Sequence, residues 1–151
     1  MATWADLEGQ APELAAEGRR LLYARGHGEA LLATVRGDAR PRIHPISIGI
    51  VGGHLYAFLL PSPKRADLEQ DGRFALHAHQ DPAAPDEFQL RGQARLVTDQ
   101  SERARAADGW PFTADDTYVL FEFAIDSALL GRRGADEWPP RYTSWRSAGS
   151  D

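Results

Sequence analysis

The run from Glu87 to Val97, in which apolar and polar residues alternate, constrains the fold more than any other segment. Its apolar members are Phe88, Leu90, Ala94 and Leu96, and its polar members are Glu87, Gln89, Arg91, Gln93 and Arg95. A period of two is typical of a β-strand with one face on a core and the other on water. Gly92 lies in the middle, where glycine marks a bulge or a close approach of another backbone. The run therefore predicts an antiparallel sheet.

Further strands are expected along the chain, without a long helix between each pair. The expected strands are Ala30–Arg36, Arg42–Ile50, His54–Leu60, Phe74–His79, Tyr118–Ile125 and Arg141–Arg146. Gly52-Gly53 predicts a tight hairpin turn, whereas Met1 to Gln10 shows no clear period. Helices are expected at Pro12–Leu22 and Ser101–Ala107. This succession disfavours a parallel sheet and favours an antiparallel barrel with short helices.

Size and composition exclude several classes of protein. The chain has 151 residues, which suits one domain over 1–151, with its core at about 29–127. A net charge of −5 argues against a nucleic-acid partner, and the lack of cysteine excludes thiolate chemistry and disulfides. No apolar run approaches the ~20 residues of a membrane span. The N-terminus shows no secretory pattern, so we expect a cytoplasmic protein.

The segment around Lys64 carries the clearest sign of a binding site. Lys64 is the one lysine among 17 basic residues. Ser62 is suited to cap a helix, Pro63 suits its first turn, and Gly72 suits its C-terminal end. Lys64 and Arg65 then lie at the positive end of the helix dipole, a placement that makes sense if an anion binds there. The alternative is a capped surface helix whose cations are solvated.

An ordered set of segments points to a known family. These segments are Leu32-Ala33-Thr34-Val35, Arg40-Pro41-Arg42-Ile43-His44-Pro45, Leu55-Tyr56-Ala57-Phe58, Ser62-Pro63-Lys64 with Asp67-Leu68, Asp71-Gly72-Arg73-Phe74-Ala75-Leu76-His77 and Arg91-Gly92-Gln93-Ala94. Over roughly residues 29 to 98 the chain resembles the pyridoxamine 5′-phosphate oxidase-like flavin-binding split-barrel family. The resemblance implies a mainly β fold with short helices: a six-stranded antiparallel split β-barrel with an N-terminal helix. It also implies a homodimer that binds a flavin or deazaflavin between its subunits.

The resemblance assigns roles to individual residues. Ser62 and Lys64, with Arg65 beside them, resemble the element that contacts the cofactor phosphate. The strand His44-Pro45-Ile46-Ser47 resembles the stretch along the isoalloxazine ring, and Arg42 and Thr34 are further candidate contacts. The small residues Pro45, Ser47 and Gly49 share the face opposite Ile46, Ile48 and Ile50, so a flat ring has room to approach the backbone. Within the C-terminal segment 139–147, Trp145 and Arg146 resemble an element that reaches the ring edge from the partner subunit. The alternative is that Trp145 is an aromatic residue that closes the end of the barrel.

Other candidate sites are weaker. His77 and His79 share one face of a strand, but no third ligand follows at a recognisable spacing, so we expect a core or interface role and no metal. His44 and His54 are candidate haem ligands. The sequence has no Gly-x-Ser-x-Gly elbow of a hydrolase. The full basic and aromatic C-terminal set of the pyridoxal-forming members is also missing, so we do not expect vitamin B6 synthesis.

We therefore expect a flavin-dependent oxidoreductase that uses FMN and acts on a small molecule; no catalytic acid or base stands out. A deazaflavin-dependent reductase is one alternative. The others are a non-catalytic protein that stores or senses flavin or haem, and a dimer that has lost its cofactor.

Overall fold

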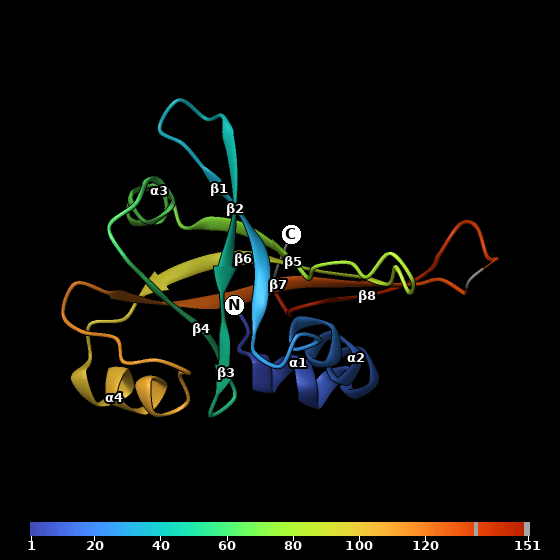
Figure 1. The fold of residues 1–151 in the computed structure, drawn as a ribbon, viewed down its shortest axis with the longest axis horizontal. Helices are drawn as coiled ribbons and strands as arrows, with labels where there is room; N and C mark the ends of the chain where they lie inside the picture. The colour runs from blue at the N-terminus through green and yellow to red at the C-terminus, as the bar shows by residue number, and fades with distance from the viewer. Residues whose placement is uncertain (135, 150–151) are drawn as a thin grey trace.

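The computed structural model describes residues 1–134 and 136–149, and its main feature is a strongly curled antiparallel sheet (Figure 1). The strands are β1 (Glu29–Val35), β2 (Pro41–Ser47), β3 (Gly49–Val51), β4 (His54–Leu59), β5 (Arg73–His77), β6 (Glu87–Leu96), β7 (Val119–Arg132) and β8 (Arg141–Arg146). Their order is β2-β1-β5-β6-β7-β4-β3, and β8 pairs with β7. The mainly β split barrel expected from the sequence is confirmed. The described residues form eight strands rather than the six that the resemblance implies. The expected run Arg42–Ile50 divides into β2 and β3, and the expected strand Arg141–Arg146 is present as β8 beside β7.

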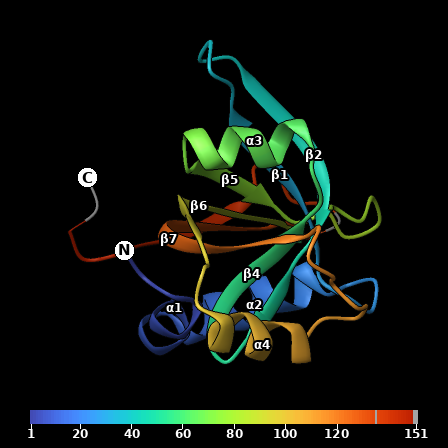
Figure 2. The same ribbon diagram turned by 90° about the vertical axis from the view of Figure 1, so that its left-hand side faces the viewer.

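The helices cover the sheet from two sides (Figure 2). They are α1 (Trp4–Gln10), α2 (Pro12–Leu22), α3 (Pro63–Gln70) and α4 (Gln100–Asp108). Helices α1 and α2 pack against β7, α3 packs against β1 and β2, and α4 packs against β3. None of the helices among the described residues is long and apolar enough to cross a membrane.

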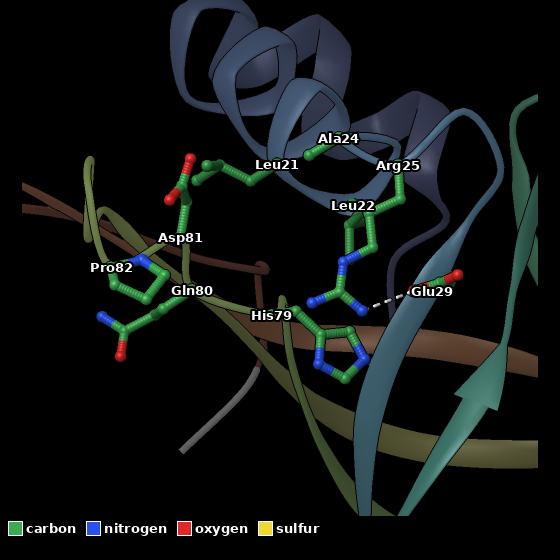
Figure 3. A pocket seen from close by; sticks show the side chains of 9 residues that line it. All are labelled: Leu21, Leu22, Ala24, Arg25, Glu29, His79, Gln80, Asp81 and Pro82. Atoms are coloured by element: carbon green, nitrogen blue, oxygen red, sulfur yellow. Dashed lines mark hydrogen bonds and ion pairs between the residues drawn. The ribbon is translucent and has the colours of Figure 1, made fainter.

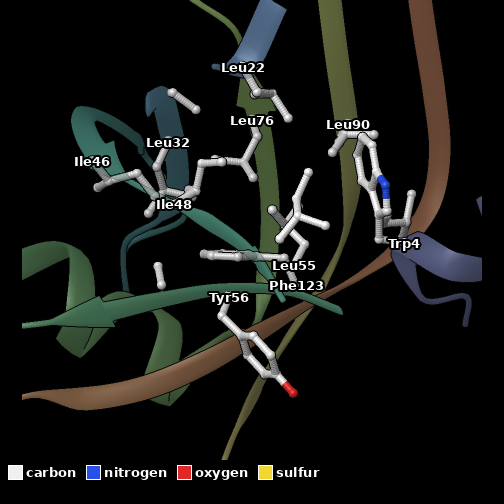
Figure 4. Packing of buried hydrophobic residues seen from close by; sticks show 14 of the residues in the cluster. Trp4, Leu22, Leu32, Ile46, Ile48, Leu55, Tyr56, Leu76, Leu90 and Phe123 are labelled. Atoms are coloured by element: carbon white, nitrogen blue, oxygen red, sulfur yellow. The ribbon is translucent and has the colours of Figure 1, made fainter. Parts of the chain in front are cut away.

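The core fills the concave side of the sheet, where side chains from most strands meet those of the two N-terminal helices (Figure 4). Trp4, Leu32, Leu76, Leu90 and Phe123 are all at most 1% exposed. Burying each of these side chains contributes roughly 1.5–3 kcal/mol to folding, so this cluster is the main source of stability.

A bulge in β7 opposite Gly92 shapes the long β6–β7 pair. Arg91 lies opposite Ser127, but Gly92 lies opposite Ile125, so Asp126 is the extra residue of β7. A Cβ at Gly92 would lie 1.9 Å from the Ala124 carbonyl oxygen, so only glycine allows this approach. The bulge or close approach expected at Gly92 is confirmed. Because the extra residue reverses the alternation of β7, the expected strand Tyr118–Ile125 ends too early, and β7 continues to Arg132.

The helix ends bear out some expectations and correct others. Helix α1 was not expected, although Thr3 and Asp6 form a reciprocal capping box and Trp4 and Leu7 are buried. Seven residues are too few to show a helical period. Helix α2 has the expected bounds, but the cap of α4 is Asp99, not Ser101.

The expected cap of α3 by Ser62 is confirmed, since the Arg65 backbone N–H donates to the Ser62 hydroxyl. Gly72 has another role than the one expected. It does not have a positive φ; instead a Cβ there would lie 2.7 Å from the Ala94 carbonyl oxygen. Gly72 therefore allows the chain after α3 to approach β6.

Candidate functional site

Strand β2 separates its predicted site residues onto two faces. In the β1–β2 ladder, His44 and Ile46 lie opposite Leu32 and Ala30, which are fully buried, so this face looks into the core. Pro45 and Ser47 lie opposite Leu31 and Glu29, which belong to the outer face of the sheet. The small face expected for this strand is the outer one at Pro45 and Ser47, whereas His44 points to the other side. The expectation is wrong for Gly49, which belongs to β3 and is buried against Trp110.

Two adjoining hollows lie at the Ser47 end of β2. The first is lined by Pro45, Ile46 and Ser47 together with Arg25, Glu29 and His79. The second shares the last three of these residues and continues between the end of α2 and the loop after β5 (Figure 3). Its volume of about 260 Å³ is slightly below the range for a whole drug-sized ligand, so it suits part of a larger one.

Charged groups fix the wall of these hollows. The Arg25 guanidinium lies 3.3 Å from one Glu29 carboxylate oxygen, and His27 Nε2 lies 2.6 Å from the other (Figure 3 draws the first pair). The expectation placed His79 in a core or interface role. Here it lines both hollows, while His77 Nδ1 contacts the Ala78 carbonyl oxygen at 2.6 Å.

The two cations at the start of α3 differ in what they contact. Arg65 donates to the carbonyl oxygen of Thr117 at 3.0 Å and to a carboxylate oxygen of Glu69 at 2.9 Å. Lys64 is half-buried and forms no hydrogen bond or ion pair with any residue in 1–134 or 136–149. Arg65 therefore holds the helix in place, whereas Lys64 makes no such contact.

A buried carboxylate ties α3 to the strands that it covers. Asp67 is 6% exposed and accepts hydrogen bonds from the Thr34 hydroxyl at 2.7 Å and from Arg42 Nε at 2.9 Å. Thr34 and Arg42 lie opposite each other in the β1–β2 ladder. Asp67 belongs to the segments that carry the family resemblance, but its role could not be predicted from the sequence, since its partners are 33 and 25 residues away in the chain. The carboxylate fixes Arg42 at the α3 end of β2.

The remaining predicted residues lie elsewhere in the chain. Trp145 is half-buried against the core and donates from Nε1 to the Gln10 side-chain oxygen at 3.1 Å. Arg146 lines a hollow with Arg91 and Ser127 on the outer face of β6 and β7. Neither residue lines the hollows beside Ser47, so one chain does not bring them to the Pro45–Ser47 stretch.

Comparison with known proteins gives a result only at the level of structure. No family model matches the sequence, and no curated protein is found to be similar. Solved structures do match, among them a heme binding protein from Mycobacterium smegmatis with a TM-score of 0.66 and 17% identity over 87% of this chain. The chain spans 57% of that protein's length.

Two further matches are to proteins of nearly the same length. A pyridoxamine 5′-phosphate oxidase-related, FMN binding protein from Nostoc punctiforme has a TM-score of 0.59 and 18% identity, covering 95% of this chain and 97% of its own. General Stress Protein 26 from Bacillus anthracis has a TM-score of 0.59 and 19% identity, covering 84% and 95%. At these identities the likeness is one of fold, and the fold is that of the pyridoxamine 5′-phosphate oxidase-like proteins.

Proposed function

We propose that this protein binds FMN along β2 and uses it to oxidise or reduce a small molecule. The observation that carries the proposal is the pair of features at the two ends of this strand: the hollow beside Pro45 and Ser47, and the unpaired Lys64 on the helix that covers the other end. Arg42 and Ser47 are five residues apart, or about 17 Å along a strand. Arg42, held by Asp67 of α3, points to the inner face of the sheet, whereas Ser47 points to the outer face. Because β2 lies at the edge of the sheet, an elongated ligand with its flat ring on Ser47 would pass over this strand to bring a terminal phosphate to Lys64.

The residues present fit this cofactor. At the phosphate end, the Lys64 ammonium and the Lys64 backbone N–H in the first turn of α3 are donors suited to an anion. The Ser62 hydroxyl donates to the Leu60 carbonyl oxygen in the structure and would turn from it to join them. At the ring end, the short side chains of Pro45 and Ser47 project little from the outer face of β2, so that a flat ring can lie against it. The bound cofactor supplies hydride chemistry, while the protein binds it, orients it and excludes water.

A second copy of the chain completes the proposed site. The outer face of the sheet exposes 64% of Ile43, and Leu31 and Ala33 beside it are only half-buried. Apolar surface on a sheet face without a covering helix favours association, and a two-fold dimer is the commonest solution. In such a dimer Trp145 and Arg146 of one copy would lie against the ring site of the other. The proposed dimer predicts a mass of about twice 16.6 kDa by light scattering.

A non-catalytic haem protein is the second candidate, because the heme binding protein of M. smegmatis shares the fold. His44 and His54 are the candidate haem ligands. In the structure His54 Nδ1 contacts the Glu122 carboxylate, and this contact would have to break for Nδ1 to bind iron.

The visible spectrum of freshly purified protein separates these candidates. We expect the two visible bands of an oxidised flavin, followed by loss of the longer-wavelength band when a reduced nicotinamide or a reduced deazaflavin is added without oxygen. A single band typical of a deazaflavin would change the cofactor but not the site. A Soret band would replace the proposal with the haem protein. A flavin that neither donor reduces would support a storage or sensing protein.

A further inference from the structure

A cluster of charged side chains lies away from the proposed flavin site, between the sheet and α4. It consists of His54 and Tyr56 from β4, Arg95 from β6, Glu122 from β7 and Glu102 from α4. Tyr56 and Arg95 each lie directly opposite Glu122 in the ladders on its two sides. The Tyr56 ring extends from β4 to the side opposite the main core (Figure 4). Three adjacent strands thus present one row of polar groups.

The two carboxylates use their oxygens differently. Glu122 Oε1 accepts from Arg95 Nη2 at 2.6 Å, while Glu122 Oε2 contacts His54 Nδ1. Glu102 Oε1 accepts from the Tyr56 hydroxyl at 2.9 Å and from Arg95 Nη2 at 2.7 Å. Glu102 Oε2 has no hydrogen bond to the described part of the chain. One imidazole nitrogen and one oxygen of each carboxylate thus face a common space, and Arg95 and Tyr56 hold the other oxygens.

The charges in this cluster are unbalanced. Although partial burial favours the neutral acid, hydrogen bonds from Arg95 and Tyr56 keep the pKa of Glu102 below its ordinary value. Two carboxylates, those of Glu102 and Glu122, thus share the one guanidinium of Arg95, and Glu122 is only 6% exposed. A further positive charge beside His54 would stabilise this arrangement.

We propose that His54 Nδ1, Glu102 Oε2 and Glu122 Oε2 bind a divalent first-row transition metal ion such as Zn²⁺. Ligand atoms of these three residues lie within 4.8 Å of one another, and this is the one such group in residues 1–134 and 136–149. Ligands at about 2.1 Å from a tetrahedral ion are roughly 3.4 Å apart. The direct contact between His54 Nδ1 and Glu122 Oε2 would therefore open to admit the ion, and side-chain rotations would bring Glu102 to the same distance. Imidazole with carboxylates is a donor set that suits Zn²⁺. Arg95 and Tyr56 then orient the ligands through their second oxygens.

The site would be open on one side. The His54 side chain is 39% exposed and that of Arg95 is 49% exposed, so solvent reaches the ion and water supplies its fourth ligand. Since the ligands come from β4, β7 and α4, the ion would also fasten α4 to the sheet. Zn²⁺ should therefore raise the melting temperature of the protein.

The test is calorimetric titration of Zn²⁺ into the full chain after treatment with a chelator. We expect one ion per chain. Glu102→Gln keeps an acceptor oxygen for Tyr56 and Arg95 but replaces the unpaired oxygen with an amide nitrogen that does not bind metals. It should weaken binding about tenfold or more, as should His54→Ala. His27→Ala removes another histidine that contacts a carboxylate, that of Glu29, and serves as the matched control with unchanged affinity.

Each result of the Zn²⁺ titration either supports the site or contradicts it. Absence of Zn²⁺ binding by the parent protein overturns the proposal whatever the variants do. Binding that survives both His54→Ala and Glu102→Gln places the ion elsewhere and overturns it too. If a variant folds poorly, the change in melting temperature of the parent on addition of Zn²⁺ decides, and no increase contradicts the site.

Discussion

At the scale of single residues, Lys64 differs from Arg42 and Arg65, two other cations predicted to lie at the cofactor site. Arg42 and Arg65 both contact acceptors within the chain, whereas Lys64 contacts none among the described residues. The sequence predicted the helix cap at Ser62 and the position of Lys64, because both depend on neighbours in the chain. It did not predict that Asp67 holds Arg42, since that contact depends on how β2 and α3 pack.

Replacing Lys64 tests the phosphate contact. Lys64→Ala removes one charge-assisted hydrogen bond, worth about 1.5–3 kcal/mol, and should weaken FMN binding roughly ten- to hundredfold. Riboflavin, which has no phosphate, should bind both proteins equally in a fluorescence titration. Arg105→Ala, which removes an exposed cation on α4, is the matched control. Equal losses for both ligands would mean that Lys64 acts through folding.

Replacing Asp67 tests the buried link between α3 and the sheet. Asp67→Ala leaves the Thr34 hydroxyl buried without its acceptor and releases Arg42, so the free energy of unfolding should fall by about 1–3 kcal/mol. Urea denaturation followed by circular dichroism measures this change. Asp116→Ala, at an exposed turn, should change stability by less than about 0.5 kcal/mol. Equal stability of Asp67→Ala and the parent would refute the link.

At the scale of elements, the strands that alternate strictly were predicted and the interrupted one was not. The alternation of β6 matches its pairing, and Gly92 marked the irregularity in advance. The sequence did not predict the second half of β7. Because Asp126 is an extra residue, the next buried residue after Ile125 is Ala128, and this break in the alternation resembles the end of a strand. A bulge of this kind is a property of two paired strands, and one strand read alone does not reveal it.

The close approach at Gly92 gives a prediction for this pair of strands. Gly92→Ala places a Cβ against the Ala124 carbonyl oxygen, and the shift that follows should cost about 1–3 kcal/mol of stability. Gly9→Ala is the matched control, because a Cβ at this α1 position meets no atom within 4 Å. Alanine favours helices, so that variant should be as stable as the parent or up to about 1 kcal/mol more stable. If thermal denaturation gives both variants the same melting temperature, the approach at Gly92 does not constrain the fold.

At the scale of the whole molecule, the curled sheet has one face filled by the core and one face partly bare. The fold could be predicted because the order of strands, turns and the capped helix along the sequence identifies it. The position of Trp145 and Arg146 relative to β2 could not be predicted, since in the proposed dimer it depends on how two copies of the chain pack. The proposed function therefore depends on whether a flavin ring lies on the bare face of β2.

Titration of FMN against Ser47→Trp tests this central claim most directly. An indole at Ser47 would occupy the outer face of β2 without entering the core, so the fold should remain and flavin affinity should fall by about tenfold or more. Ser101→Trp, at an exposed position of α4, controls for the added aromatic surface. Circular dichroism of all three proteins verifies the fold. Loss of FMN binding in Ser47→Trp alone is the predicted result, whereas unchanged FMN affinity in a folded Ser47→Trp protein would contradict the account.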